Sequence, residues 1–364
     1  MDKITNIPEI RFDGFTDAWE QRRLGEVVDI RSGRDYKHLN KGNIPVYGTG
    51  GYMLSVDEAL SYEDDAIGVG RKGTIDKPYL LKAPFWTVDT LFFSIPKTDY
   101  DLYFVNDIFQ RINWKQLDES TGVPSLSKTA INAVKVQVPT FEEQIKIGNF
   151  FKHLDHLITL HQRKLELLYE TKQTFLSQMF PKGEESVPEI RFEGYADAWE
   201  QRRLGDTVVI FAGGDIDKSK LKKVGKYPVL ANALTNDGIV GYYDSDFRIE
   251  APAVTVTGRG DVGYAKARKV NFTPVVRLLA IKSDNDVDFL ENAINNHKVL
   301  VESTGVPQLT SPQLANYKIL FPTIGEQTQI GTFFAAIDHL TTLHQRKLNT
   351  LKEIKKTLLK KMFV

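Results

Sequence analysis

Residues 8–25 read PEIRFDGFTDAWEQRRLG, and residues 188–205 read PEIRFEGYADAWEQRRLG. The two blocks differ at only three positions. Further along the chain, Ser120–Pro124 (STGVP) recurs as Ser303–Pro307. A period near 180 residues is too long for a solenoid repeat, so the sequence indicates two tandem domains of like fold.

The two repeats share their ends but not their middles. Residues 31–118 and 211–301 show little similarity, although nearly identical blocks flank both. Duplication followed by drift is one explanation, but drift alone leaves no sharp edges between near-identity and near-randomness. Two domains that share attachment surfaces and bind different ligands would produce this pattern, and we favour that interpretation.

The composition excludes several classes of protein. The chain has 364 residues, of which 41% are hydrophobic and 26% charged, and it has no cysteine. Without cysteine there is no disulfide scaffold and no Cys-ligated zinc or iron–sulfur site. The apolar runs are far below the ~18 residues that span a bilayer, and the first residues form no apolar signal segment. We therefore expect a cytoplasmic protein without membrane contact. The net charge of zero argues against a simple basic nucleic-acid binder.

Each repeat is predicted to end in a long helix. Thr140 follows a strand-like stretch that stops at a proline, and Glu143 lies three residues further on. This spacing is a capping-box pattern, in which each side chain satisfies a free backbone N–H group at the start of a helix. The second repeat has Thr323 and Glu326 in the same places.

Both predicted helices carry a heptad pattern of a coiled coil. We expect them over residues 142–183 and 323–364, each about 60 Å long at about 1.5 Å per residue. Ten consecutive a and d positions in each copy are typical of a coiled coil. The positions are Ile147, Phe151, Leu154, Ile158, His161, Leu165, Leu168, Lys172, Phe175 and Met179 in the first helix, and Ile330, Phe334, Ile337, Thr341, His344, Leu348, Leu351, Lys355, Leu358 and Met362 in the second.

The two helices are expected to pair with each other as an antiparallel coiled coil with pseudo-twofold symmetry. Parallel pairing in register would place Lys172 against Lys355, which charge repulsion disfavours. Antiparallel pairing centred near His161 and His344 instead places each lysine opposite a phenylalanine. The alternative, in which each helix pairs with another chain, stays open.

The histidines of these helices are not predicted to hold a metal. His156 and His161 are five residues apart, about 140° around a helix, so they cannot chelate one ion. His153 and His156 share a face but have no third ligand nearby. We interpret all three as surface or seam residues.

The first repeated block contains a tryptophan and an arginine pair. Trp19 and its counterpart Trp199 are most simply core residues. Arg22–Arg23 and Arg202–Arg203 have two interpretations that the sequence does not separate: solvated surface, or a docking site for a partner or for phosphate.

Each divergent middle contains a glycine-rich loop. Gly68–Gly73 (GVGRKG) and Gly258–Gly263 (GRGDVG) both match G-x-G-x-x-G. A dinucleotide site would need a helix directly after the glycines, whereas proline or β-like residues follow here. We interpret both as tight strand-to-strand loops that lift Arg71, Lys72 or Arg259 to a surface.

Basic and polar residues around these loops are the candidate DNA contacts. Arg and Lys reach guanine edges or phosphates, Asn can pair with adenine, and Thr and Tyr can contact phosphate. A solvated loop is the plainer interpretation of any single residue, but for the clusters as a whole we favour contact. The candidates are Arg34, Lys37, Lys41, Thr49, Tyr52, Arg71 and Lys72 in the first domain, and Lys218, Lys220, Lys222, Lys223, Asn232, Arg259 and Lys266 in the second.

The sequence contains no enzyme signature. It lacks a G-x-x-x-x-G-K-[ST] phosphate loop, an Asn/Asp-Pro-Pro-aromatic methyltransferase tetrad and a Pro-Asp dipeptide that would open a restriction-nuclease motif. Ser125–Lys128 matches S-x-x-K, but its counterpart Gln308–Ser311 does not. We expect a non-catalytic chain. A two-lobed protein-binding scaffold and an enzyme of unknown type are the rival hypotheses.

In this order the motifs resemble the specificity subunit of a type I restriction–modification system, over essentially the whole chain. The repeated blocks at residues 8–25 and 188–205 resemble the start of the family's target recognition domains. Ser120–Pro124, followed by Pro139 and Glu143, resembles the run into its long helices, and the second repeat has the same series.

The resemblance implies an α+β fold with two tandem mixed α/β target recognition domains, residues 1–141 and 184–322. A long spacer helix follows each of them, residues 142–183 and 323–364. Each recognition domain would read one half of an asymmetric bipartite DNA target. The helices would set the spacer and dock two methyltransferase subunits. The residues expected for docking and for the helix seam are Leu154, Ile158, His161, Leu165, Leu168, Ile337, Thr341, His344, Leu348 and Leu351.

The resemblance also implies partners and cofactors. The partners would be double-stranded DNA, two modification subunits that bring S-adenosylmethionine and methylate adenine, and restriction subunits that use ATP and Mg. This chain is expected to hold no cofactor or metal of its own. The neutral net charge then indicates a chain that binds DNA weakly by itself and relies on its partner subunits to neutralise DNA phosphates.

Deleting one heptad from each helix should shorten the unread spacer without changing the bases of either half-site. DNA rises about 34–36 Å per turn, so helices of about 60 Å suit half-sites about one turn apart. Methylome sequencing of cells carrying the deletion measures the spacer directly. An unchanged spacer, or a continuous motif in the parent protein, would contradict this role of the helices.

Overall fold

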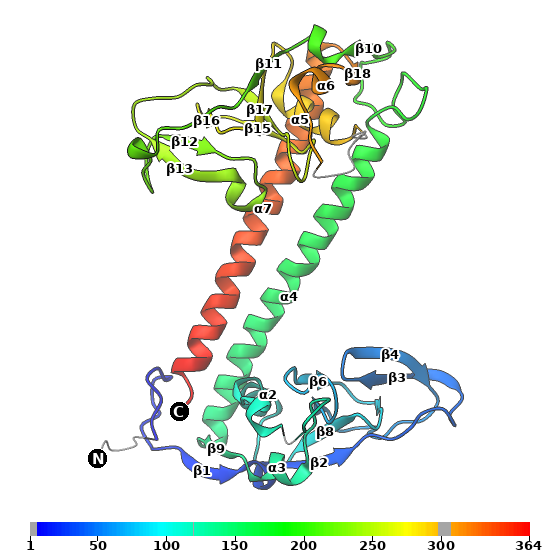
Figure 1. The fold of residues 1–364 in the computed structure, drawn as a ribbon. Helices are drawn as coiled ribbons and strands as arrows, with labels where there is room; N and C mark the ends of the chain where they lie inside the picture. Colours follow the sequence, from blue (N-terminus) through cyan, green and yellow to red (C-terminus); the bar gives the residue numbers. More distant parts are fainter. Residues whose placement is uncertain (1–5, 119, 298–306) are drawn as a thin grey trace. The chain divides into compact units, whose positions relative to one another are not determined.

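The computed structural model describes residues 6–118, 120–297 and 307–364. The chain divides into two compact units, residues 1–162 with 346–364, and residues 163–345. The helices α4 (Phe141–Gln178) and α7 (Ile324–Lys361) each contribute to both units (Figure 1). Among the described residues, no helix is long and apolar enough to cross a membrane.

The other elements follow the same order in both units. Unit 1 contains β1 (Glu20–Arg23), α1 (Leu24–Val27), β2 (Val28–Ser32), β3 (Lys41–Gly48), β4 (Gly51–Val56), β5 (Ala66–Gly70), β6 (Tyr79–Leu81), β7 (Trp86–Thr87), β8 (Leu91–Pro96), α2 (Leu102–Arg111), the 3-10 helix η1 (Trp114–Leu117), α3 (Lys128–Ala133) and β9 (Lys135–Val138). Unit 2 contains β10 (Glu200–Arg203), η2 (Leu204–Asp206), β11 (Val209–Ala212), η3 (Lys218–Lys220), β12 (Tyr227–Leu230), η4 (Thr235–Gly238), β13 (Ile239–Tyr243), β14 (Ala253–Thr257), β15 (Ala265–Arg268), β16 (Thr273–Pro274), β17 (Leu278–Lys282), α5 (Val287–Asn295), α6 (Ser311–Ala315) and β18 (Lys318–Phe321).

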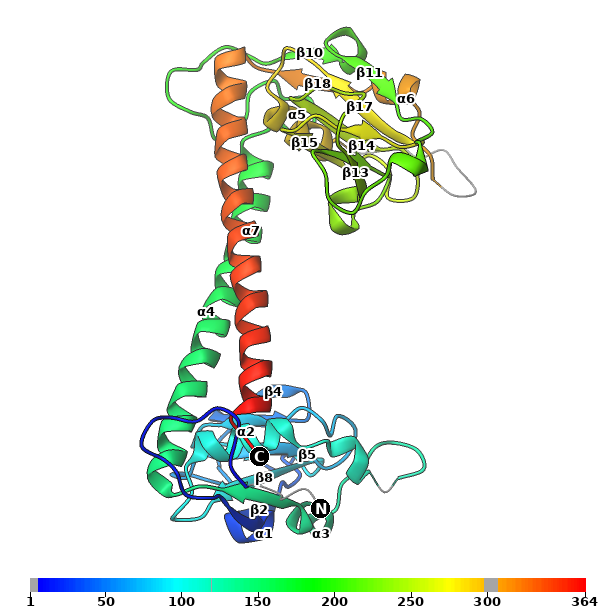
Figure 2. The same cartoon turned by 90° about the vertical axis from the view of Figure 1, so that its left-hand side faces the viewer.

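The described parts of the two units repeat one set of sheets. In unit 1 the strand orders are β1-β9, β2-β8-β5-β6 and β4-β3-β7, and in unit 2 they are β10-β18, β11-β17-β14-β15 and β13-β12-β16. The helix α2 packs on β5 and β8, and α5 packs on β14 and β15 (Figure 2). This mixture of helices and sheets confirms the predicted α+β fold and shows that the divergent middles share one architecture.

The glycine-rich loops connect strands, as predicted. The first begins in the last residues of β5 and leads towards β6, the second lies between β14 and β15, and both strand pairs are antiparallel. No helix follows the glycines in either loop, so neither has the geometry of a dinucleotide-binding turn.

A Met-Phe pair directly after or at the end of each long helix packs into the hydrophobic core of a unit, Met362 and Phe363 in unit 1 and Met179 and Phe180 in unit 2. In unit 1, Phe363 stacks on Phe104 with ring centroids 5.4 Å apart and meets the edge of Trp19 at 5.8 Å. In unit 2, Phe180 stacks on Phe289 at 5.7 Å and meets Trp199 at 5.7 Å. Both tryptophans are buried, which confirms their expected place in the core.

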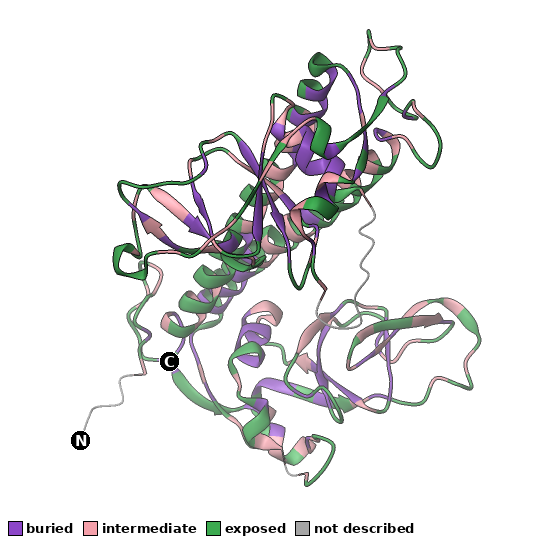
Figure 3. Cartoon of the chain, turned by 45° about the horizontal axis from the view of Figure 1, so that its top comes forward, coloured by how far each residue is buried: buried purple, intermediate pink, exposed green. Residues whose placement is uncertain are grey.

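The helix seam is formed as the heptads predict. All the predicted seam residues are buried or half-buried, and buried and exposed positions alternate along the long helices (Figure 3). In unit 1, Leu351 and Leu358 of α7 join the cluster that contains Leu154 of α4. In unit 2, Phe175 of α4 joins the cluster that contains Phe334 of α7. Each unit thus pairs the start of one helix with the end of the other, and this confirms the antiparallel direction.

The seam lysines, which we expected opposite Phe334 and Phe151, each form an ion pair with an aspartate of the facing helix. Lys172 Nζ lies 2.7 and 2.8 Å from the two carboxylate oxygens of Asp338, and Lys355 Nζ lies 2.5 Å from Asp155 Oδ1. A half-buried ammonium group is costly without a counter-charge, and the carboxylates of Asp338 and Asp155 supply it.

A buried ion pair joins each repeated block to the start of a long helix. Arg11 Nε and Nη2 each donate to one oxygen of Glu143 at 2.7 Å, and Glu143 is fully buried. Arg191 and Glu326 repeat this arrangement at 2.6 and 2.8 Å. The predicted capping boxes are therefore corrected in part: Thr323 accepts from the Glu326 N–H at 3.5 Å, but both glutamate side chains bind arginine.

Phe363→Ala should destabilise unit 1, because the substitution empties a buried site that ties the end of α7 to the domain core. We expect a loss of about 3–5 kcal/mol in the free energy of unfolding of this unit, measured by denaturant titration together with hydrogen exchange of unit 1 amides. Val364→Ala is the adjacent control, since Val364 is exposed and should change little. Equal losses for the two variants would contradict the anchoring role.

Candidate nucleic-acid interface

One short segment supports three candidate contact loops in unit 1. We call residues 87–90 the support segment of unit 1. The backbone N–H of Arg34 donates to the Thr87 carbonyl at 2.8 Å, and that of Arg71 donates to the Thr90 carbonyl at 2.8 Å. The Val88 N–H donates to the Tyr47 carbonyl at 3.0 Å, next to the turn between β3 and β4. Loops that are distant in sequence are therefore brought together.

Unit 2 builds the same support from different residues, 274–277. The Pro274 carbonyl accepts from Gly214 N at 3.2 Å, and the Arg277 carbonyl accepts from Gly258 N at 3.1 Å. The Val275 N–H donates to the Leu230 carbonyl at 2.8 Å. The two divergent middles thus present different side chains from one backbone framework.

A glycine in each unit permits the close packing of these loops on the support segment. A Cβ added to Gly33 would lie 2.0 Å from the Val88 carbonyl oxygen, and one added to Gly213 would lie 2.0 Å from the Val275 carbonyl oxygen. No other residue type fits so close an approach of two backbones. The position is the same in both units although the flanking sequences differ.

The repeated STGVP motif leads into a segment that holds each glycine-rich loop. In unit 1, Gly73 N donates to the Pro124 carbonyl at 2.9 Å, and Leu126 N donates to the Arg71 carbonyl at 2.9 Å. In unit 2, Gly260 N donates to the Pro307 carbonyl at 3.2 Å. The rest of the second motif, residues 303–306, lies outside the described residues. Our sequence reasoning did not find this role, since hydrogen bonding between distant loops leaves no local pattern.

In unit 1 the candidate residues are at the surface. Arg34, Lys37, Lys41, Tyr52, Arg71 and Lys72 are exposed, and Thr49 is half-buried. Arg71 Nη1 donates to the Asp89 carbonyl at 3.4 Å, and its guanidinium lies 5.8 Å from the centre of the Phe92 ring. Lys128 Nζ lies 5.9 Å from the same ring, so it is a further cation of this loop cluster that the sequence did not single out.

In unit 2 several of the predicted contacts already have partners within the chain. Lys220 pairs with Asp246 at 3.0 Å, Lys222 pairs with Asp244, and Lys266 lies 3.7 Å from Glu291. The hydrogen bond from Lys222 lowers the pKa of Asp244, and the hydrogen bond to Asp246 raises the pKa of Lys220, so each of these two groups is stabilised in its charged form. Among the described residues, Lys218, Lys223 and Arg259 form no ion pair, and all three are exposed.

Asn232 positions the second glycine-rich loop. Its Oδ1 accepts from Gly258 N at 2.7 Å and from Arg259 N at 3.3 Å, and its Nδ2 donates to the Arg259 carbonyl at 2.5 Å. Most of the hydrogen-bonding capacity of the amide is therefore used within the chain. Asn232 was expected as a possible adenine contact; in this structure it fixes the backbone that carries Arg259.

Arg277 is a further candidate that sequence reasoning missed. It is exposed in the support segment, and its φ of +76° is in the left-handed region that non-glycine residues rarely adopt. Strained backbone of this kind clusters at functional sites. An isolated arginine after two valines gave no sequence signal for this conformation.

The repeated arginine pairs lie on the surface of β1 and β10. All residues of both strands are exposed, and Arg22 and Arg202 pair with Glu20 and Glu200 respectively. These carboxylate neighbours favour solvated surface over a phosphate site for Arg22 and Arg202.

The loop clusters carry exposed arginine and lysine side chains on a hydrogen-bonded backbone support. Exposed arginine and lysine side chains contact phosphates and guanine edges, and their rigid backbone support fixes where they project. Among the described residues, no group of three or more His, Asp or Glu side chains is suited to hold a metal ion.

Known proteins of one family are similar to this chain in sequence and in fold. Residues 16–170 and 196–353 match the family described as type I restriction modification DNA specificity domain. A putative type I specificity subunit of Mycoplasma pneumoniae is 26% identical over 337 residues, which cover 85% of this chain and 86% of that protein. The specificity subunit of a type I restriction enzyme of Methanocaldococcus jannaschii is 22% identical over 280 residues, 67% of this chain and 65% of that protein.

A solved structure has the same fold. The S subunit of a type I restriction–modification system from M. genitalium superimposes with a TM-score of 0.78, over 98% of this chain and 99% of that chain, at 15% sequence identity. The fold and the two matched regions define a class of non-catalytic DNA-recognition subunits. The chain belongs to the family of type I restriction–modification DNA specificity subunits.

Asn232→Ala should loosen the loop that carries Arg259, because it removes three hydrogen bonds to that backbone. We expect the Gly258 and Arg259 amides to exchange with solvent about tenfold faster or more, in keeping with the loss of a bond worth about 1 kcal/mol or more. Thr49→Ala is the matched control in unit 1 and should leave these amides unchanged. Unchanged exchange in Asn232→Ala would show that the support segment alone fixes the loop.

Proposed function

We propose that the loop cluster on each support segment reads one half of an asymmetric bipartite DNA target. The observation that carries this proposal is the repeated framework: residues 87–90 and 274–277 form equivalent backbone bonds, while the side chains that the loops display differ. The same backbone arrangement displays different exposed arginine and lysine side chains in the two units, and this suits two different DNA half-sites.

The long helices act as the spacer between the half-sites, and they dock two methyltransferase subunits. The predicted docking residues largely fill the seam within this chain, so we propose that docking uses exposed leucines beside it. Leu157 and Leu160 of α4 are 43% and 52% exposed, and their counterparts Leu340 and Leu343 of α7 are 43% and 39% exposed. Exposed apolar residues repeated in both helices suit two copies of one partner.

The chemistry of the complex resides in its other subunits under this proposal. The modification subunits bring S-adenosylmethionine and methylate adenine, and restriction subunits bring ATP and Mg for translocation and cleavage. The complex acts on DNA in the cytoplasm. The sequence lacks the phosphate-loop, methyltransferase and nuclease motifs named above, and this supports the division of labour.

Arg71→Ala should alter recognition of one half-site only, and Arg259→Ala that of the other. A base-reading contact should cost about 1–3 kcal/mol and relax the preference at one position, whereas a phosphate contact should weaken all sequences alike and reduce the salt slope by about 1. The measurement is binding of the complex with its modification subunits to duplexes with single base changes, at several salt concentrations. Each variant controls for the other.

Two results would refute the proposal. Equal effects of Arg71→Ala on both half-sites would contradict the modular assignment. No salt-dependent binding to duplex DNA, with or without the modification subunits, would favour the protein-binding scaffold instead.

A further inference from the structure

A hollow in unit 1 is lined by buried acceptors that lack partners. It has a volume of about 430 Å³ and lies between α2 and α4, beside Leu80 of β6. Asp107 and Asn106 of α2 line it and are 1% and 4% exposed. Asp107 Oδ2 and Asn106 Oδ1 are both buried without a hydrogen-bond partner. Unpaired buried acceptors are destabilising, so their presence needs a reason.

The electrostatics of the hollow leave one carboxylate without its own counter-charge. Asp155 of α4 also lines it and is already paired with Lys355. Burial raises the pKa of Asp107 well above its usual range, and Asp155 and Asp101 add to this rise, against the attraction of Lys355. Lys152 lines the hollow as well, but its ammonium lies on the ring of Tyr103, 4.2 Å from the ring centre.

The corresponding region of unit 2, beside α5, contains a buried carboxylate with an ammonium partner from the same unit. Asp101 and Asp286 cap α2 and α5 in the same way, through bonds of 2.9 Å from Phe104 N and Phe289 N. By this match Glu291 corresponds to Asn106, and Asn292 corresponds to Asp107.

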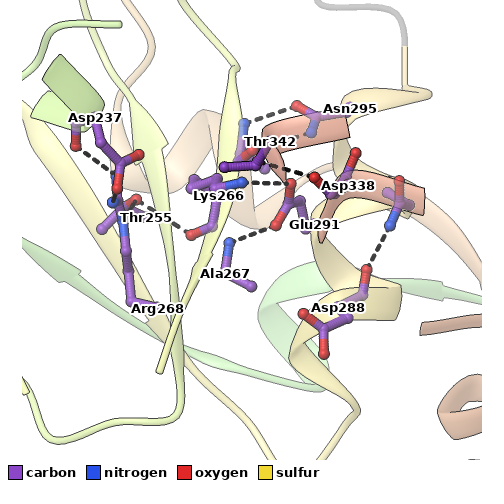
Figure 4. A network of polar contacts seen from close by, with 12 residues as sticks. Asp237, Thr255, Lys266, Ala267, Arg268, Asp288, Glu291, Asn295, Asp338 and Thr342 are labelled. Carbon is purple, nitrogen blue, oxygen red and sulfur yellow. Dashed lines mark hydrogen bonds and ion pairs between the residues drawn. The ribbon is translucent and has the colours of Figure 1, made fainter. Parts of the chain in front are cut away.

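Glu291 is satisfied from within the chain. It accepts from Ala267 N at 2.7 Å, and the ammonium of Lys266 lies 3.7 Å away (Figure 4). Burial raises the pKa of Glu291, and the charge of Lys266 opposes this rise. Asp338, the counterpart of Asp155, has its own partner in Lys172. Unit 2 thus has two carboxylate–ammonium pairs here, Glu291 with Lys266 and Asp338 with Lys172.

Unit 1 cannot supply the second ammonium from the same strand. The cross-strand pairs Ala66–Leu81 and Ala253–Arg268 align β6 with β15, which places Tyr79 where unit 2 has Lys266. Tyr79 is committed elsewhere, since its hydroxyl donates to the Gly48 carbonyl at 2.6 Å. Unit 1 thus has neither the Glu291 carboxylate nor the Lys266 ammonium, and its buried carboxyl group is one residue further along, at Asp107.

We propose that the hollow beside Asp107 is a binding site for a primary ammonium group on a short alkyl chain. The group supplies from outside what Lys266 supplies within unit 2. Leu80 and the Tyr103 ring offer apolar surface to the alkyl chain, and Asp107 with Asn106 accepts the N–H bonds. A metal ion fits less well, because the described residues hold no group of three or more metal-ligating side chains. The ammonium comes either from a lysine side chain of a partner subunit or from a free diamine. This inference does not depend on which bases the domain reads.

The test is thermal unfolding of the full chain with n-butylammonium chloride, with sodium chloride at equal ionic strength and 1-butanol as controls. We expect a saturable rise in unfolding temperature with n-butylammonium only. Asp107→Asn should weaken this response about tenfold or more, since it replaces one acceptor oxygen with an NH2 group that cannot accept the N–H bond. The variant should fold, because unit 2 has asparagine in the equivalent place.

Two further variants complete the test. Leu80→Lys places an ammonium in the wall of the hollow, so it should raise the unfolding temperature and abolish the response. Glu291→Gln in unit 2 is the matched control and should leave the response intact. The proposal is overturned if n-butylammonium acts no better than sodium chloride, or if Asp107→Asn responds like the parent.

The assembled complex distinguishes the two sources. If a lysine of a modification subunit fills the site, assembly should abolish the n-butylammonium response, and Asp107→Asn should weaken assembly. If the source is a free diamine, the response should persist in the complex, and 1,4-diaminobutane should reproduce it.

Discussion

The packing of a Met-Phe pair against a repeated tryptophan is the constraint on which the rest of the structure depends. Phe363 packs on Trp19 in unit 1, and Phe180 packs on Trp199 in unit 2. Each long helix is thus fixed to a domain core at its far end, while a buried arginine–glutamate pair fixes its start. With both ends fixed, the helix direction and the heptad register follow, and Lys172 and Lys355 meet aspartates.

The divergent middles can vary because their backbone bonds do not depend on most side chains. The support segments, residues 87–90 and 274–277, hold their loops through peptide groups, and Gly33 and Gly213 allow the close approach. Backbone hydrogen bonds tolerate almost any sequence, so the exposed loop residues are free to vary. The two units therefore keep one backbone framework while their exposed loop side chains differ.

The two units are not equivalent in their buried polar groups. Glu291 has an ammonium partner from its own domain, whereas Asp107 has a buried oxygen without any partner. In a low-dielectric interior a missing partner costs more than a formed pair gains. The two copies of the fold thus carry their buried carboxyl group one position apart, at Glu291 in unit 2 and at Asp107 in unit 1.

The sequence by itself determined the repeat, the two helices with their seam, the buried tryptophans and the glycine loops, because each has a local period or a motif. It also placed most candidate contacts at exposed loops. Only the tertiary structure decided that Glu143 binds Arg11, that Asn232 holds the Arg259 loop, and that Lys128 and Arg277 join the clusters. Only the tertiary structure showed that a carboxyl oxygen of Asp107 is buried without a hydrogen-bond partner. The physical reason is that these partners are distant along the chain, and hydrogen bonds between distant groups leave no periodic trace in the sequence.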